Sequence, residues 1–381
     1  MDASGQGPIR VREAKPGGFG EKGKTKARAV SGLDSLPGGG DDRGVASEQH
    51  GTRSQLRMVA CPTCGNKLFL PSELPPLSET ECGKCKHSVM IPMELRQFEL
   101  RAKIAEGGMG TVYRAFDTTL RREVAVKLMR EERLKDEDAQ DAFLREARAL
   151  AQLNHTNIIH IYTFDEHSGK SYLVMELADR GSLDDRIAAG PLPELDVLDI
   201  GVKIASALDV ALRHGYLHRD IKPANILFNA DGEPKLVDFG LAKSAEEEEE
   251  GEDAVWGTPY YIAPEKVMRE GETFLSDMYS LAATLYHALT GQAPFEASSA
   301  EEVVAAHVHT PLTPPNAVNP NISQPTSDAI VKAMAKSPAD RYQSYDEFIM
   351  ALTAARSQYL YNTLVRRQGE KSGGIKGWFR R

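Results

Sequence analysis

Apolar and polar residues alternate along 98–117 and 122–129, two segments that are rich in β-branched residues and separated by a short turn. Alternation with a period of two buries one face of a β-strand, so these segments predict the strands of a hairpin. The apolar stretches at 158–166 and 170–177 predict two further strands. The chain from Phe98 onward is therefore expected to open with a sheet.

The spacing of apolar residues changes to three or four in later segments. In 136–153, the apolar residues from Phe143 to Leu150 fall on one face of a helix. Three more helices are predicted by the same period, at 194–215, 274–291 and 345–360. Gly215 is expected to end the first of these three. A strand-rich part followed by a helical part predicts an α+β fold with two lobes.

Two flanking segments lack such periodicity. Residues 1–57 are rich in Gly, Ser, Lys, Arg and Asp, which predicts a disordered N-terminal tail; a docking or regulatory tail is the alternative. Residues 356–381 form a basic C-terminal tail that ends with Trp378 and Phe379 between cations. Gly373, Gly374 and Gly377 favour disorder over a helical anchor for a membrane surface or a partner.

Composition narrows the class of protein. The chain has 381 residues, of which 41% are hydrophobic and 27% charged, and its formal net charge is −9. This balance is typical of a globular protein and gives no sign of nucleic-acid binding. We expect no transmembrane span and no signal peptide, because no long apolar run or apolar leader is present. Four cysteines in two pairs fit a reducing compartment, so a cytoplasmic location is expected.

The four cysteines predict a metal site within residues 58–92. Two C-x-x-C pairs, separated by seventeen residues, can place four thiolates around one tetrahedral Zn²⁺; they are Cys61, Cys64, Cys82 and Cys85. All four positions are filled by protein, so the zinc would be structural rather than catalytic. We expect Gly65 and Gly83 to supply the tight turns. A redox dithiol, or two unrelated pairs, is the alternative. The segment resembles the short bacterial zinc-ribbon modules that precede other domains.

The segment KIAEGGMGTVY, from Lys103 to Tyr113, has the spacing of a glycine-rich phosphate loop. Glycines let backbone amides approach phosphate oxygens, because no Cβ stands in the way. Ala105 occupies the first glycine position of the pattern. An extended Ala105 costs little, whereas a positive φ there would cost about 1–2 kcal/mol. Such a loop alone is common by chance.

Further segments follow the loop in a specific order. Lys127 lies in the predicted strand VAVK. Glu146 lies in a predicted helix, where its carboxylate can pair with the Lys127 ammonium. The segment HRDIKPANIL carries Asp220, Lys222 and Asn225. The segments VDFG, which contains Asp238, and GTPYYIAPE come next.

In this order and spacing, residues 98 to about 355 resemble a protein kinase domain, similar to the bacterial serine/threonine kinases of the Hanks type. The resemblance implies a two-lobed protein kinase fold with a β-rich N-lobe and an α-helical C-lobe, preceded here by the small four-cysteine zinc ribbon. It also implies ATP and Mg²⁺ as cofactors and protein serine or threonine hydroxyls as acceptors. Lys222 marks the serine/threonine branch.

The resemblance assigns roles to single residues. Asp220 would accept the proton of the attacking hydroxyl, and Lys222 would meet the γ-phosphate. Lys127, held by Glu146, would bind the α- and β-phosphates. The Mg²⁺ ligands would be Asn225 and Asp238. The ATP site would comprise Ile104, Ala105, Glu106, Gly107, Gly108, Met109, Gly110, Val112, Ala125, Lys127, Met175, Glu176 and Ala178.

The resemblance also implies supporting contacts. We expect Phe239 to pack against the helix of Glu146, and Thr258 to hydrogen-bond near the catalytic loop. Two further expectations concern contacts of carboxylates. Glu265 should pair with Arg341, and Asp277 should brace the backbone at His218 and Arg219.

The segment between Asp238 and Glu265 contains five consecutive glutamates, Glu246 to Glu250. Kinases with an arginine before the catalytic aspartate, as Arg219 is here, usually need a phosphate on this segment. One hypothesis is that carboxylates of the acidic run replace that phosphate. The alternative is a solvated run without a partner.

An active serine/threonine protein kinase is the leading prediction, with a possible protein partner for the zinc ribbon. The alternative is a pseudokinase scaffold, which would be expected to lack one of the chemical residues, and none is missing. A small-molecule phosphotransferase of similar fold is a third class. The segment GTPYYIAPE argues against it, because in the resembled family this segment receives a polypeptide.

Overall fold

The computed structural model describes residues 56–108, 110–134, 136–239 and 259–376. Residues 54–381 form one compact unit, and the described segments all lie within it. The side chains of 131, 137 and 366–376 are outside the description, as are the predictions made above for 1–55, Met109, Thr258 and the acidic run.

Residues 56–90 contain two small antiparallel hairpins. One pairs β1 (Leu56–Ala60) with β2 (Lys67–Pro71), and the other pairs β3 (Glu79–Glu81) with β4 (Ser88–Met90). The buried residues between them are few: Val59, Cys61, Leu68, Cys82 and Val89. So small an apolar core cannot hold a fold by itself, which leaves a role for a metal.

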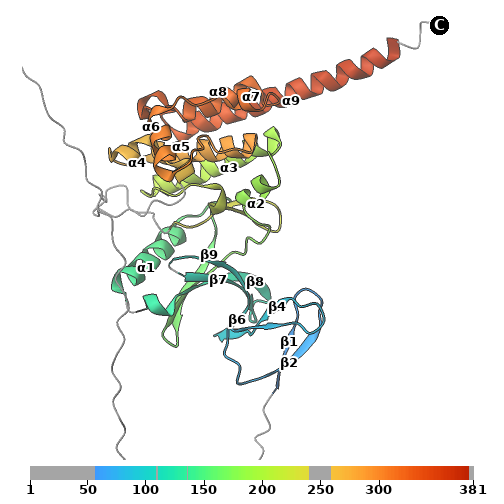
Figure 1. Cartoon of the computed structure of the whole chain (residues 1–381), viewed down its shortest axis with the longest axis vertical. Coiled ribbons are helices and arrows are strands. Elements are labelled where there is room, and N and C mark those ends of the chain that lie inside the picture. The colour runs from blue at the N-terminus through green and yellow to red at the C-terminus, as the bar shows by residue number, and fades with distance from the viewer. Residues whose placement is uncertain (1–55, 109, 135, 240–258, 377–381) are drawn as a thin grey trace, which may run out of the picture. The chain divides into compact units, whose positions relative to one another are not determined.

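A six-stranded antiparallel sheet follows (Figure 1), in the order β5-β6-β7-β8-β10-β9. Its strands are β5 (Met93–Leu95), β6 (Phe98–Glu106), β7 (Gly110–Asp117), β8 (Arg122–Met129), β9 (Ile161–His167) and β10 (Lys170–Met175). The strand predicted at 158–166 begins later than expected, because Ile158 and Ile159 are engaged with Leu236 instead. The other predicted strands are present.

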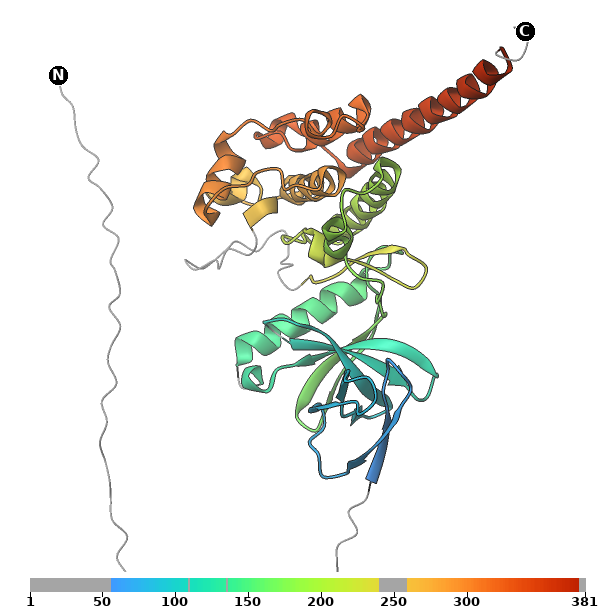
Figure 2. The ribbon, with the colours of Figure 1, turned by 45° about the vertical axis from the view of Figure 1, so that its right-hand side comes forward.

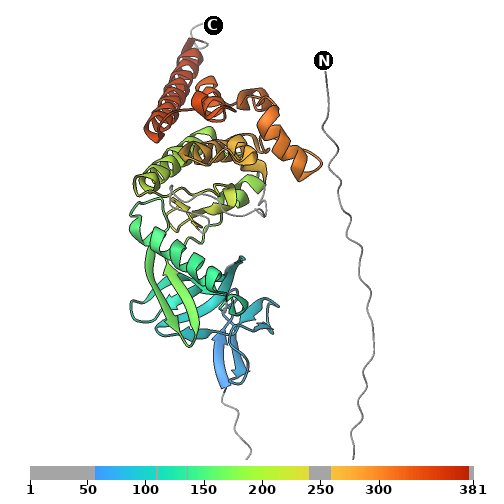
Figure 3. The ribbon, with the colours of Figure 1, turned by 90° about the vertical axis from the view of Figure 1, so that its left-hand side faces the viewer.

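Helix α1 (Glu137–Gln152) lies against this sheet, as Figure 3 shows. Asp136 caps its N-terminus by accepting a hydrogen bond from the Ala139 amide. Phe143 and Ala147 pack with Met129 and Leu173 of the sheet. The apolar face predicted from the sequence is therefore the face that is buried.

The second lobe is helical, with one short hairpin of β11 (Ile226–Phe228) and β12 (Pro234–Leu236). Helices α3, α5, α8 and α9 pack on one another around its apolar core. The helices are α2 (Leu183–Ala188), α3 (Glu194–Arg213), α4 (Pro264–Met268), α5 (Phe274–Thr290), α6 (Ala300–His309), α7 (Pro315–Val318), α8 (Gln324–Ala333) and α9 (Tyr345–Lys376). Single 3₁₀ turns lie at Glu131–Arg133, Pro223–Asn225, Pro259–Tyr261 and Pro338–Asp340.

The end of α3 follows the predicted glycine stop. Gly215 has φ +78, and its amide donates to the Leu212 carbonyl at 2.8 Å. The Tyr216 amide donates to the Ala211 carbonyl at 3.0 Å, which completes a Schellman motif. This tight end leads directly into the segment that carries His218.

The C-terminal stretch differs from the expected irregular tail. Helix α9 continues to Lys376, beyond the helices on which its first half packs (Figure 2). The glycines at 373 and 374 do not end it, because a helix that is already formed propagates more easily than it nucleates. Among the described residues, no helix is long and apolar enough to cross a membrane.

Candidate active site

Lys127 on β8 and Glu146 on α1 form a buried ion pair between the sheet and its covering helix. The Lys127 Nζ lies 2.7 Å from both Glu146 Oε1 and Oε2. Burial raises the pKa of Glu146, and the Lys127 ammonium opposes that shift. The Asp238 Oδ1 lies 3.8 Å from the same Nζ. The expected Lys127–Glu146 pairing is thus confirmed, and Asp238 faces it.

Asp220, Lys222 and Asn225 are joined in a second polar group. Lys222 Nζ donates to Asp220 Oδ2 at 2.7 Å. Asn225 Nδ2 donates to the same Oδ2 at 3.0 Å and to the Asp220 carbonyl at 2.8 Å. The side chains of Asp220 and Lys222 are about a quarter exposed, at 28% and 25%. The Asp220 carboxylate is therefore fixed in direction yet open to a reactant.

Asp277 of α5 holds the backbone that leads into this group. Its Oδ2 accepts from the His218 amide at 2.7 Å, and its Oδ1 accepts from the Arg219 amide at 2.8 Å. Burial raises the pKa of Asp277, and the nearby His218 lowers it. The bracing contact expected for Asp277 is confirmed, since both of its oxygens accept hydrogen bonds from the backbone at His218 and Arg219.

Phe239 anchors the residue that precedes it. Its ring is fully buried in the same cluster as Leu150 and Leu153, two residues at the end of α1 and just beyond it. It also contacts the His218 ring edge-on, with centroids 4.5 Å apart. Asp238 itself has φ +66, a left-handed conformation that turns the backbone between the buried ring and the site. Phe239 is thus part of the same apolar cluster as the end of α1, in agreement with its expected packing toward the helix of Glu146.

The glycine loop connects β6 and β7. The Gly107 amide donates to the Gly110 carbonyl at 2.9 Å, and Ala105 pairs in register with Val112. Ala105 is a strand residue and is not among the described residues with positive φ. It therefore carries no left-handed strain. Glu106 forms ion pairs with Lys103 and with Arg130, the latter at 2.8 Å.

Gly110 is the position of the loop where a side chain cannot fit. A Cβ there would lie 2.6 Å from the Leu128 carbonyl oxygen, whereas a Cβ at Gly108 would meet open space. Gly110→Ala should therefore lower the free energy of unfolding by about 1–3 kcal/mol through forced displacement of the sheet. It should also raise the KM for ATP. Gly108→Ala is the matched control, expected within about 0.5 kcal/mol of wild type in urea unfolding. Equal effects of the two substitutions would contradict this steric account.

Several residues expected at the ATP site lie on the strands of the sheet or in the segment that joins the two lobes. Ala125 on β8 is buried and stands opposite Met175 on β10 in the sheet register. Ala178 is buried, whereas Ile104 is exposed. Val112 is half-buried.

Glu176, in the segment that joins the two lobes, is anchored by contacts that were not predicted from the sequence. Its carboxylate accepts from Lys235 Nζ at 2.8 Å and from Asn229 Nδ2 at 3.3 Å. Its amide donates to the His160 carbonyl at 2.8 Å. Among the described residues, no backbone hydrogen bond to the Glu176 carbonyl is present, so this oxygen can accept one from a ligand. No motif marks Lys235 or Asn229, because both lie more than fifty residues away in the sequence.

Glu265 and Arg341 form a buried, bidentate pair beneath the segment that begins at residue 259. Arg341 Nη1 and Nη2 each donate to one Glu265 oxygen at 2.7 Å, and the Arg341 side chain is 0% exposed. Burial would raise the pKa of Glu265, but Arg341 and the Ser276 hydroxyl hold it below its usual value. Arg341 also donates to three backbone carbonyls. The pair expected from the sequence is confirmed.

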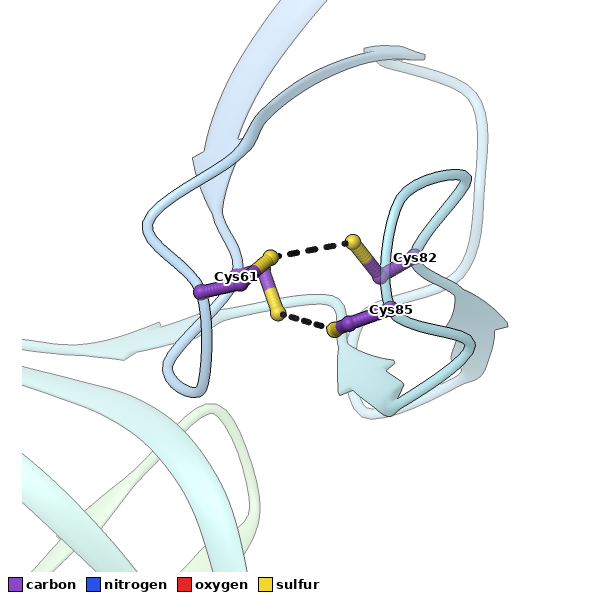
Figure 4. A group of neighbouring side chains, drawn as sticks. Cys61, Cys82 and Cys85 are labelled. Atoms are coloured by element: carbon purple, nitrogen blue, oxygen red, sulfur yellow. Dashed lines mark hydrogen bonds between the residues drawn. The ribbon is translucent and has the colours of Figure 1, made fainter.

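The four cysteine sulfurs converge between the two N-terminal hairpins. Figure 4 shows the side chains turned toward a common point. Cys61 Sγ lies 3.6 Å from Cys85 Sγ, Cys64 Sγ lies 3.6 Å from Cys82 Sγ, and all four sulfurs lie within 4.8 Å of one another. Each of the four cysteines is a free thiol.

The turns that follow the two C-x-x-C pairs differ from the expectation. Gly65 has φ +69 and donates to the Cys61 carbonyl, as expected. In the second turn the left-handed residue is Lys86, with φ +63, and it donates to the Cys82 carbonyl. Gly83 is not among the described residues with positive φ. The reversal in each turn falls directly after the second cysteine, so Gly83 was the wrong position.

A family model of the protein kinase domain matches residues 98–354. A probable serine/threonine-protein kinase of Clostridium perfringens is 36% identical over 255 residues, which are 66% of this chain and 37% of that protein. The serine/threonine-protein kinase PknH of Mycobacterium bovis is 37% identical over 68% of this chain and 44% of its own. A probable serine/threonine-protein kinase PknB of Lactococcus lactis is 34% identical over 68% and 42%.

The chain belongs to the protein kinase family, and its similar relatives carry the name of the serine/threonine class. The matching region spans about two fifths of the length of these three relatives.

Proposed function

We propose that the chain is an ATP-dependent serine/threonine protein kinase. The observation that carries the proposal is that Lys127, Glu146 and Asp238 lie together while Asp220, Lys222 and Asn225 form an adjoining group. Between them, the two groups contain the charged and polar residues that phosphoryl transfer requires. A scaffold without catalysis would not need to keep both.

The roles of the side chains follow from their free atoms. The Asn225 amide nitrogen donates hydrogen bonds to Asp220. The Asn225 amide oxygen therefore remains available to bind a cation. The Asp238 side chain is 52% exposed and offers carboxylate oxygens. These oxygen donors fit Mg²⁺, which would neutralise charge on the triphosphate. We assign both residues to that ion.

In the transfer step, Asp220 orients the acceptor hydroxyl and takes its proton. The hydroxyl oxygen bonds to the γ-phosphorus as the bond to the β–γ bridging oxygen breaks, and ADP leaves. Lys222, 2.7 Å from Asp220, stands where it can stabilise charge on the transferred group. Lys127, steadied by Glu146, holds the α- and β-phosphates. Ala125, Met175 and Ala178 would contact the adenine, together with the Glu176 carbonyl.

The proposal is tested by incubating the full chain with ATP and Mg²⁺ and a generic basic protein, and mapping phosphosites by mass spectrometry. Asp238→Asn serves as the control, because it removes the exposed carboxylate. Phosphoserine or phosphothreonine that depends on Asp238 is expected. No transfer to either protein would favour the scaffold.

We also propose that residues 58–92 bind one structural Zn²⁺ ahead of the kinase domain at 98–355. Sulfurs in tetrahedral ZnS₄ sites are about 3.8 Å apart, given Zn–S bonds of about 2.3 Å. The 3.6 Å contacts between sulfurs fit this arrangement. The Cys85 amide, donating to the Cys82 sulfur, lowers the pKa of Cys82 to about 6 although burial raises it. A thiolate is thereby favoured near neutral pH.

Zinc content gives a prediction that does not depend on kinase activity. Metal analysis of the purified chain should find about one zinc per chain, and Cys82→Ser should lower that content several-fold because it removes a ligand. Lys84→Ala, in the same turn but exposed, is the control and should keep the metal. A folded N-terminal segment without zinc would refute the proposal.

Free cysteines also support a reducing compartment, and we place the protein in the cytoplasm. The zinc module is proposed to bind a protein partner, since its hairpin exposes Met58 at 54% and Phe69 at 63%.

A further inference from the structure

Arg219, which precedes the catalytic Asp220, is a buried cation. Its side chain is only 7% exposed, and its φ of +67 fixes an unusual backbone turn. Within the described part of the chain, its Nε has no hydrogen-bond partner. A buried guanidinium without a nearby anion is strongly unfavourable, so the placement of compensating charge affects this loop.

Among the described residues, Glu272 in the turn between α4 and α5 places a carboxylate beside Arg219. Glu272 Oε2 lies 3.9 Å from Arg219 Nε, and Glu272 Oε1 lies 2.6 Å from Lys266 Nζ. Lys266 in turn donates to the Arg219 carbonyl at 3.4 Å. The Glu272 side chain is 5% exposed, so solvent screens these charges weakly.

The arrangement links three elements through one carboxylate. Glu272 sits between a cation of the catalytic loop and a cation of α4, and Asp277, five residues later, binds the backbone of the same loop. Burial raises the pKa of Glu272, while Lys266 favours the charged form. Glu272 therefore supplies a negative charge beside Arg219, the residue for which the resemblance implies a phosphate as partner.

We propose that Glu272 is a positioning residue that compensates Arg219 from within the C-lobe, so that the catalytic loop is held without phosphorylation of the segment 240–258. The proposal rests on the proposed kinase function. In this proposal the charge of Arg219 is compensated by Glu272 of the C-lobe, whereas the sequence had suggested Glu246–Glu250 for that role.

The first test replaces the charge without changing the shape. Glu272→Gln should lower kcat by about tenfold to a hundredfold, because displacement of the loop misplaces Asp220, with the KM for ATP little changed. Glu270→Gln removes a charge from an exposed neighbour and should leave kcat unchanged. Equal kcat values for Glu272→Gln and wild type would overturn the proposal.

The second test separates charge compensation from a merely structural role. If the loss arises from an uncompensated Arg219, then removing that cation as well should restore activity. The double variant Arg219→Met/Glu272→Gln should have a kcat several-fold above that of Glu272→Gln. A double variant that is no more active than the single one would overturn the proposal.

A phosphatase experiment distinguishes this inference from the proposed function. Wild type treated with a protein phosphatase, and then freed from it, should keep its activity toward a generic basic protein. Activity that is present before treatment and lost after it would refute the proposed role of Glu272, but it would be consistent with the proposed kinase function. Absence of activity in both samples would instead reject the kinase function itself.

Discussion

Asp220→Asn should lower kcat by about 10²–10⁴-fold, the range that a positioned acid or base contributes. Asparagine keeps the size of the side chain but cannot take a proton from the acceptor hydroxyl. It also loses the charge that holds Lys222 at 2.7 Å. Steady-state phosphorylation of a serine-containing protein at saturating ATP measures this loss.

Nucleotide affinity is the control for this substitution. Asp220 contacts Lys222 and Asn225, whereas Lys127 and Glu146 form the separate ion pair. The affinity for ATP, measured by calorimetry, should therefore change little in Asp220→Asn. A variant that keeps its kcat would show that another group accepts the proton. A variant that loses ATP binding would show that the two groups are not separate.

Arg341→Met should lower the free energy of unfolding by about 3–5 kcal/mol, the usual effect of breaking a buried ion pair. The substitution leaves the buried carboxylate of Glu265 without its bidentate partner, and it also removes the donors to three carbonyls. Chemical denaturation followed by far-UV circular dichroism measures the change.

An exposed pair provides the comparison for this stability prediction. Arg356 and Asp199 also form an ion pair, but their side chains are 39% and 41% exposed. Arg356→Ala should cost no more than about 1 kcal/mol, because water screens the pair. Similar losses for Arg341→Met and Arg356→Ala would show that burial of Glu265 carries no penalty.

The chemistry of the site could be predicted from the sequence because short segments carry it. Lys127, Asp220 and Asp238 each lie in a motif whose order is fixed along the chain. The pairings Lys127–Glu146 and Glu265–Arg341 could be expected only through the resemblance, since 19 and 76 residues separate the partners. Periodicity also placed the strands and the buried face of α1.

Contacts between distant elements were beyond reach of local patterns. The approach of Glu272 to Arg219 depends on how α4 and α5 pack below the catalytic loop, and no motif contains both residues. The anchoring of Glu176 by Lys235 is of the same kind. The turn at Lys86 was missed for a different reason. Glycine is the residue that most often adopts a left-handed conformation, so the turn was predicted at Gly83 and not at a lysine.

The measurement that tests the central claim most directly counts two products in one reaction. Purified full chain is incubated with ATP, Mg²⁺ and a serine-containing protein, and both ADP and protein-bound phosphate are quantified. The account predicts about one phosphate on serine or threonine for each ADP released, and both products lowered by about a hundredfold or more with Asp220→Asn. ADP without protein phosphate, or equal turnover by Asp220→Asn, would contradict it.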